Sequence, residues 1–102
     1  MIGDILKRMR LIYGFKASEM SKTIGISPSY LSEIESGKKQ PSLDHLQKYA
    51  NCFGIKLSSL ILLSESYEEA EKEGKGTAMI RSMMISLIRN MSMAESDTHE
   101  EK

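Results

Sequence analysis

The sequence is poor in the residues that build disulfide frameworks, metal clusters and membrane spans. Its 102 residues include one cysteine, two prolines and no tryptophan. A single cysteine excludes an internal disulfide and a cysteine-rich zinc site, and it favours a reducing compartment. The apolar run LSSLILLS at 57–64 is far shorter than the roughly 20 residues that span a bilayer. The opening MIGDILKRMR lacks the apolar stretch of a signal peptide, so we expect a soluble cytoplasmic protein with no membrane partner.

The net charge is zero, which would argue against a nucleic-acid partner if the charges were evenly spread. The 14 basic and 14 acidic residues are distributed unevenly. Residues 1–64 carry a net charge of +4, and residues 65–102 carry −4. We therefore expect the two parts of the chain to face different partners.

The spacing of apolar residues predicts five short helices within residues 1–64. They are expected over about 3–13, 17–24 and 28–36, then from 42 to Gly54, and from 57 to 64. Ser27 followed by Pro28 is a strong start signal, because serine caps a helix and proline fits its first position. Apolar and polar residues alternate over no more than a few positions, so the chain is predicted to be all-α.

The composition changes from Glu65 onward. Residues 65–76 are acidic and contain two glycines, which predicts a linker or a fraying extension of the preceding helix. Residues 77–93 form an amphipathic helix in this interpretation, and residues 94–102 form a disordered acidic tail. The apolar stripe of the helix at 77–93, which we expect to mediate oligomerisation, consists of Met79, Ile80, Met83, Met84, Leu87, Ile88 and Met91.

Residues 15–55 have the pattern of two short helices joined by a tight turn, a helix-turn-helix. Gly25 allows the turn a positive φ that most residues resist, and Ile26 fills the angle between the helices. The second helix then projects from the domain with its polar residues outward, where they can enter a major groove of DNA.

This stretch resembles the phage Cro/repressor, or Xre-type, helix-turn-helix family over roughly residues 2–63. The matching residues are Arg10, Glu19–Ser21, Gly25–Ser27, the run LSEIESGKKQPS at 31–42, Leu46, Ala50, Gly54 and Leu60. The opening MIG and the run SYLSEIESGKKQPS at 29–42 also resemble regulators of the SinR type. The resemblance implies a five-helix lambda-repressor-like domain, followed here by the C-terminal amphipathic helix.

The resemblance also implies a role for individual residues. Base contacts are implied for Pro28, Ser29, Tyr30 and Glu33. Phosphate contacts are implied for Lys16, Ala17, Lys38, Lys39 and Ser42. A glutamate in the groove can accept a hydrogen bond from a cytosine amino group. Arg10 and Glu35 match family positions whose charged pair holds the first helix to the end of the third.

The start of the second helix departs from the family pattern. The family usually has Thr-Gln or Ser-Gln where this chain has Lys16 and Ala17. The missing N-cap costs about 1 kcal/mol, and the glutamine that contacts phosphate and supports the recognition helix is absent. Lys16 would supply phosphate attraction instead.

These features predict a sequence-specific DNA-binding regulator, a dimeric repressor of bacterial, phage or mobile-element origin. Two copies of helix 28–36 would enter successive major grooves of an inverted repeat, about 34 Å apart. The expected partners are double-stranded DNA and further copies of the chain, as a homodimer or a higher homo-oligomer. No arrangement of residues suggests an enzyme, a metal site or a cofactor.

Several alternatives remain open at this point. The helix at 77–93 could dock an antagonist or toxin protein, or fold back on its own domain, and the domain could be a bundle without a DNA role. Glu33 could be solvated or pair with a nearby lysine, and Tyr30 could pack on the second helix. Lys38 and Lys39 could be an ordinary solvated loop. Cys52 is interpreted as a buried free thiol rather than a redox sensor, and His45 and His99 lack partners for a metal site.

Overall fold

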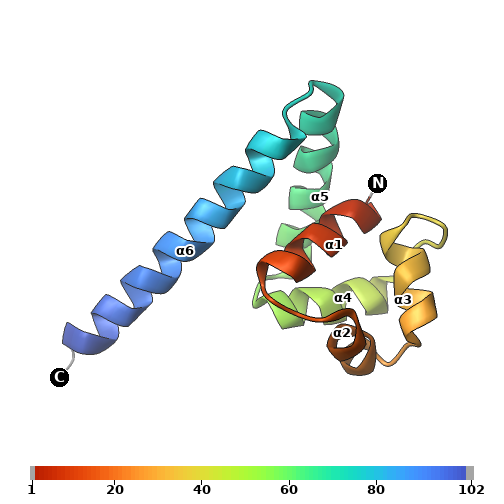
Figure 1. The fold of residues 1–102 in the computed structure, drawn as a ribbon, viewed down its shortest axis with the longest axis horizontal. Coiled ribbons are helices and arrows are strands. Elements are labelled where there is room, and N and C mark those ends of the chain that lie inside the picture. Colours follow the sequence, from red (N-terminus) through yellow and green to blue (C-terminus); the bar gives the residue numbers. More distant parts are fainter. Residues whose placement is uncertain (1, 101–102) are drawn as a thin grey trace. The chain divides into compact units, whose positions relative to one another are not determined.

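A computed structural model describes the backbone of residues 2–100 and the side chains of residues 2–86 and 88–89. Every regular element in this part of the chain is an α-helix, which confirms the all-α prediction (Figure 1). The helices are α1 (Ile2–Ile12), α2 (Ala17–Ile24), α3 (Pro28–Glu35), α4 (Leu43–Phe53), α5 (Leu57–Lys72) and α6 (Gly76–Glu100). None of these helices, within the described residues, is long and apolar enough to cross a membrane.

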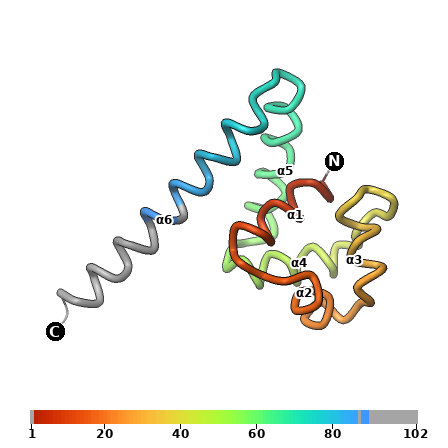
Figure 2. Tube along the Cα trace, viewed as in Figure 1, coloured from red at the N-terminus to blue at the C-terminus, as the bar shows by residue number. Residues whose placement is uncertain are grey.

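The chain divides into two compact units, Met1–Glu69 and Ala70–Lys102. The trace in Figure 2 follows the first unit from α1 to α5, with short turns from α1 to α2 and from α2 to α3 and a longer loop at 36–42 between α3 and α4. These turns place α3 next to both α1 and α2.

The ends of α1 to α4 lie within one or two residues of the expected positions, because local signals mark them. The Ser27 side chain accepts a hydrogen bond from the backbone N–H of Tyr30 at 3.0 Å and caps α3. Gly25 and Gly54 end α2 and α4 in the left-handed region, with φ of 86° and 67°. Helix α2 begins at the expected residue without a side-chain cap from Lys16. The Glu19 carboxylate instead accepts the Lys16 backbone N–H at 2.8 Å.

Helix α5 is longer than expected, so the region between α5 and α6 is shorter than the predicted linker. The predicted linker at 65–76 is helical as far as Lys72, which corresponds to the helix extension left open above. Glutamate, alanine and lysine favour helix, and Tyr67 anchors the extension. Tyr67 is 1% exposed, and its hydroxyl donates a hydrogen bond to Asp4 Oδ2 of α1 at 2.7 Å. Gly74, with φ of 75°, follows the end of the helix.

Helix α6 contains the whole of the amphipathic helix expected at 77–93. The side chain of Met91 and those of the expected acidic tail at 94–102 lie outside the described residues. The backbone at 94–100 belongs to α6, so the tail that was expected to be disordered is helical as far as Glu100.

The core of the first unit is formed by the apolar stripes of α1 to α5. Its most buried members are Ile5, Leu6, Met9, Met20, Ile24, Leu31, Ile34, Tyr49, Ala50 and Leu60. Tyr13 is half-buried and stacks on Phe53, with ring centroids 4.9 Å apart. Cys52 is a free thiol, as predicted, but it is half-buried rather than buried, and this partial burial raises the pKa of the Cys52 thiol. A raised thiol pKa leaves little reactive thiolate near neutral pH.

A polar cluster lies inside this apolar core. Arg10 of α1 donates hydrogen bonds to the Glu35 carboxylate from Nε, at 2.9 Å to Oε2, and from Nη2, at 3.0 Å to Oε1. The pair that the resemblance implied is thus present, and each residue is 7% exposed. Arg10 Nη1 also donates to the Phe15 carbonyl at 2.9 Å, and the Tyr49 hydroxyl of α4 donates to Glu35 Oε2 at 3.0 Å. The cluster therefore joins three helices and the turn after α1.

Gly3 brings the start of α1 against the end of α3. A Cβ atom at this position would collide with the backbone carbonyl of Ile34 and would lie 3.1 Å from that of Glu35. Only glycine permits this approach without a shift of one helix. The two helices therefore touch through their backbones at this point.

Alkaline pH is expected to destabilise the chain through Tyr49. Burial, and then the negative charge of Glu35, raise the folded-state pKa of Tyr49 well above its ordinary value of 10.0. The stabilisation that comes from this shift is fully present below pH 10 and is lost as the pH rises further, because only the unfolded state then releases the proton. The decline has a limiting slope of about 1.4 kcal/mol per pH unit.

Urea unfolding of the chain between pH 8 and pH 11 would measure this decline. Tyr49→Phe should show a shallower decline than the wild type. Equal slopes for Tyr49→Phe and the wild type would contradict the assignment.

Candidate nucleic-acid interface

Helix α3 buries one side and presents the other to solvent. Leu31, Ile34 and Glu35 are buried within its eight residues. The exposed positions are Pro28, Ser29 and Ser32, together with Ser36 at the C-cap, while Tyr30 and Glu33 are half-buried. All four residues with implied base contacts therefore reach solvent from one short helix. A helix of this kind fits a major groove about 12 Å wide.

The turn before α3 has the geometry expected of Gly25. The backbone N–H groups of Gly25 and Ile26 both donate to the Ser21 carbonyl, at 2.9 and 3.0 Å. This arrangement ends α2 and reverses the chain, so α3 begins three residues later. Helices α2 and α3 pack directly on each other, which confirms the helix-turn-helix.

The aromatic and cationic neighbours of Tyr30 come from α4 and from the loop before it. The Tyr30 and His45 ring centroids are 5.8 Å apart, with an interplanar angle of 69°, so one ring edge faces the other ring. Lys39 Nζ lies 5.8 Å from the Tyr30 ring centroid. Packing on the second helix was the alternative for Tyr30, and these contacts instead place its ring beside α4.

Glu33 is paired with a lysine of the loop that follows α3. Its carboxylate lies 4.0 Å from Lys39 Nζ, and both side chains are substantially exposed. An exposed pair of this kind contributes at most about 1 kcal/mol. Either partner can therefore exchange the other for a group on DNA at little cost.

The residues with implied phosphate contacts lie on elements that flank α3. Lys16, Lys38, Lys39 and Ser42 are exposed, and Ala17 is half-buried. The backbone N–H groups of Lys38 and Lys39 both donate to the Glu33 carbonyl, at 2.8 and 3.1 Å, so the loop backbone is held against the end of α3. The Ser42 hydroxyl is occupied as the cap of α4, where it accepts the His45 N–H at 3.1 Å.

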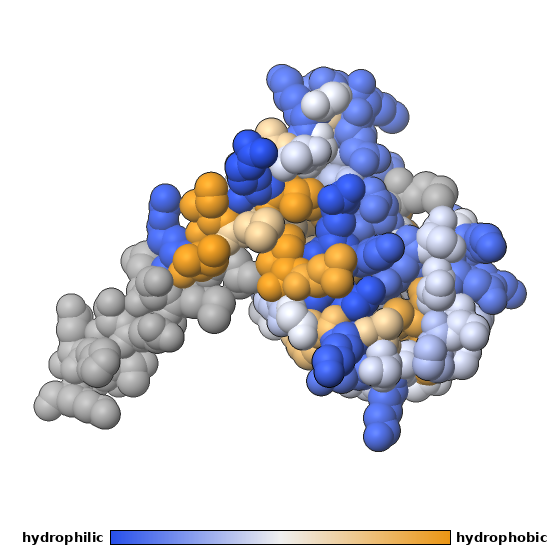
Figure 3. Space-filling model, viewed as in Figure 1, coloured by the Kyte–Doolittle hydropathy of each residue, from blue (hydrophilic) through white to orange (hydrophobic). Residues whose placement is uncertain are grey.

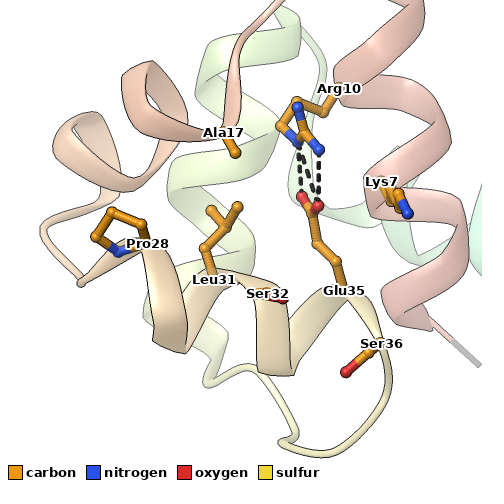
Figure 4. A pocket seen from close by; sticks show the side chains of 8 residues that line it. All are labelled: Lys7, Arg10, Ala17, Pro28, Leu31, Ser32, Glu35 and Ser36. Atoms are coloured by element: carbon orange, nitrogen blue, oxygen red, sulfur yellow. Dashed lines mark hydrogen bonds and ion pairs between the residues drawn. The ribbon is translucent and has the colours of Figure 1, made fainter.

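A hollow of about 200 Å³ opens between α1, α2 and α3 (Figure 4). Ala17 faces it at the start of α2, at the position where the family has the larger glutamine. Pro28 faces it at the start of α3. The sequence did not single out Lys7, Ser32 or Ser36, although the two serines follow Pro28 at intervals of four. The lining residues are Lys7, Arg10, Ala17, Pro28, Leu31, Ser32, Glu35 and Ser36.

Sequence reasoning also missed His45, which was considered only as a metal ligand. Its Nδ1 accepts the Ser42 backbone N–H at 3.3 Å, so the two residues cap α4 reciprocally. The sequence could have predicted this cap, because His45 occupies the third helical position after a serine cap, where a capping box has its side-chain acceptor. The contact of His45 with Tyr30 could not be predicted from the sequence, because it joins residues on different helices.

The predicted oligomerisation stripe of α6 divides into covered and uncovered residues. Ile80 is buried, and Met79 and Met83 are half-buried. Met84 and Ile88 are 44% and 62% exposed, and Ile85, which was not predicted, is 51% exposed. The side chain of Leu87, like that of Met91, is outside the described residues. Figure 3 shows apolar surface along the described part of this helix.

The chain is similar to known regulators of transcription. A family model described as Helix-turn-helix matches residues 6–60, which is more than half of the chain. The transcriptional regulator ClgR of Mycobacterium tuberculosis is 33% identical over 72 residues, covering 71% of this chain and 62% of ClgR. The HTH-type transcriptional regulator SinR of Bacillus subtilis is 27% identical over 99 residues, covering 93% and 87%. The chain thus spans about three fifths of the length of ClgR.

Solved structures give the same fold. The N-terminal DNA-binding domain of SinR from Bacillus subtilis has a TM-score of 0.53 and 32% identity, covering 60% of this chain and 90% of that domain. A SinR protein/SinI protein complex matches with a TM-score of 0.53 and 22% identity over 94% of this chain and 99% of the matched one. At that identity the second match supports the fold alone.

Loss of the α3 cap is expected to destabilise the interface helix. Ser27→Ala removes the acceptor for the Tyr30 N–H and should lower the free energy of unfolding by about 1 kcal/mol. Ser29→Ala changes an exposed serine of the same helix that forms no cap, and it should stay within about 0.5 kcal/mol of the wild type. Urea unfolding of the three chains measures the difference. Indistinguishable midpoints for Ser27→Ala and Ser29→Ala would show that the cap does not hold α3.

Proposed function

The chain belongs to the Xre-type helix-turn-helix family, and from this premise we propose that it is a repressor that binds an inverted-repeat operator as a dimer. Its relatives are DNA-binding regulators of transcription rather than enzymes. The observation that carries the proposal is α3, which is fixed on its buried side and exposes small and polar residues on the other. Repression would follow from occlusion of the operator.

In this proposal α3 enters the major groove. Ser29 and Glu33 provide polar groups for base edges, and Glu33 would accept a hydrogen bond from a cytosine amino group. The carboxylate enters a region rich in phosphate charge, which is unfavourable unless it gains such a partner. Lys39, whose Nζ lies 4.0 Å from the Glu33 carboxylate, would reduce this cost. Tyr30 would contact a thymine methyl group or a phosphate.

The flanking residues would contact the two phosphate backbones. Lys38 and Lys39 lie in the loop after α3, and Lys16 lies before α2. Residues 1–64 carry a net charge of +4, which favours approach to DNA. Each phosphate neutralised releases condensed counterions, so affinity should fall steeply with salt.

A second copy of the chain is proposed to cover α6. Met84, Ile85 and Ile88 follow one another within little more than a turn and are all exposed. One helix cannot bury such a strip by itself, and exposed apolar patches usually mark an interface. An inverted-repeat operator needs two recognition helices related by a twofold axis, which a dimer of this chain supplies.

The same strip suits a second candidate function, in which α6 docks a different protein and DNA binding is controlled by that antagonist or toxin. Methionine adapts to irregular surfaces, and Met79, Met83 and Met84 all lie on this helix. The similarity to the chain from a SinR/SinI complex makes this candidate worth testing alongside the first.

Selection of bound duplexes from a random pool tests the proposed function. We expect enrichment of two half-sites in inverted orientation, with centres about one helical turn apart or a multiple of that spacing. Enrichment of no sequence, together with no retardation of any duplex at low salt, would contradict it.

Substitutions of two lysines test the proposed phosphate contacts, and a third lysine serves as the control. Lys38→Gln should weaken binding about equally for selected and unrelated duplexes, and Lys38→Gln and Lys39→Gln should each reduce the salt slope by about 1. Lys56→Gln, on the exposed residue just before α5, should leave the slope unchanged. Loss of selectivity without a change in slope would contradict the phosphate assignment.

Charged substitutions on α6 are expected to separate self-association from DNA binding. Met84→Asp with Ile88→Asp places two charges in the exposed strip, so light scattering should show a monomer where the wild type is a dimer. Operator affinity should fall at least tenfold, because two half-sites no longer bind together. Ser86→Asp, also exposed on α6, should remain a dimer. A monomeric wild type would overturn self-association and favour the docked-protein candidate.

A further inference from the structure

His45 makes two separate contacts with its imidazole ring. Nδ1 accepts the Ser42 backbone N–H, which holds the ring at the start of α4. The ring also meets Tyr30 edge to face, at 5.8 Å between centroids. This geometry is one of the favoured arrangements of two aromatic rings. A side chain held by the α4 cap therefore touches a residue of the recognition helix.

Tyr30 has a second neighbour in Lys39. The Lys39 ammonium lies 5.8 Å from the Tyr30 ring centroid, within the range of a cation–π contact. The same ammonium is 4.0 Å from the Glu33 carboxylate. Tyr30 and Glu33, both with implied base contacts, are thus connected through Lys39, and Tyr30 is connected through His45 to α4.

We propose that His45 is a positioning residue that holds the Tyr30 ring in the orientation that reads DNA, and so sets base preference at the pair facing Tyr30. This inference rests on the proposed function and names a specificity determinant for it. His45 itself need not touch a base.

The physical basis is the conformational freedom of Tyr30. A half-exposed tyrosine on a short helix can adopt more than one χ1 rotamer, and each rotamer presents the ring to a different part of the groove. A contact with a fixed neighbour selects one rotamer before DNA arrives, so less entropy is lost on binding. An aromatic pair contributes about 0.5–1.5 kcal/mol, which corresponds to about a 2- to 10-fold preference between bases.

Two substitutions separate the ring of His45 from its capping group. His45→Gln keeps a side-chain acceptor at the third helical position, where glutamine serves in a capping box, but removes the ring. His45→Phe keeps a ring beside Tyr30 but removes the acceptor for the Ser42 N–H. The melting temperature reports the cap, and the affinities for the selected operator and for duplexes changed at single base pairs report base preference.

The expected results differ in opposite directions for the two variants. His45→Gln should melt close to the wild type and lose about 2- to 10-fold of its preference at one base pair of each half-site. His45→Phe should melt at a lower temperature and keep the wild-type preference at that pair. A merely structural role would move the melting temperature and leave relative base preference unchanged.

A double variant identifies Tyr30 as the residue through which His45 acts. Tyr30→Ala should lose preference at the same base pair, and adding His45→Gln to it should cause no further loss, because the two changes remove one shared effect. Full additivity of the two losses would overturn the proposal.

Two further outcomes would also decide the matter. Wild-type preference in His45→Gln, or equal loss of preference in His45→Gln and His45→Phe, would overturn this inference alone. A wild-type chain that selects no sequence would overturn the proposed function and this inference with it.

Discussion

The buried ion pair between Arg10 and Glu35 is the interaction on which the position of α3 depends. Two opposite charges in an apolar core are costly to desolvate, and they are tolerated only where hydrogen bonds satisfy them. Arg10 donates hydrogen bonds from Nε and both terminal nitrogens. The Glu35 carboxylate accepts hydrogen bonds from Arg10 and from the Tyr49 hydroxyl. These directional contacts fix the end of α3 relative to α1 and α4, while Ser27 fixes its beginning. Apolar packing alone would allow α3 to rotate or slide more easily.

The first four helices could be predicted from the sequence because local residues determine where they start and stop. Serine caps, Pro28 and the glycines at 25 and 54 act within one turn of the chain, so their effect can be recognised without a structure. The Arg10–Glu35 pair joins residues 25 positions apart, and only the family resemblance made it predictable. The family resemblance also indicated which positions of α3 face outward.

The features that could not be predicted depend on contacts between distant segments. The extension of α5 to Lys72 is anchored by a hydrogen bond between Tyr67 and Asp4, which are 63 residues apart. The contact of His45 with Tyr30 depends on how α4 lies beside α3. Likewise, helical spacing gave a continuous stripe on α6, whereas the structure buries Ile80 and exposes Ile85. Amphipathic periodicity identifies a face but does not show which part of it is covered.

Gly3 has a consequence for the redesign of this protein. At its start, α1 contacts the end of α3 through backbone atoms. On its own helix, α3 is packed into the domain by the buried side chains of Leu31, Ile34 and Glu35. The exposed side chains of Ser29 and Ser32 lie outside this packing, whereas the Ser36 hydroxyl donates a hydrogen bond to the Glu33 carbonyl at 3.2 Å. Substitutions at Ser29 and Ser32 would therefore change the exposed surface of α3 without repacking the domain.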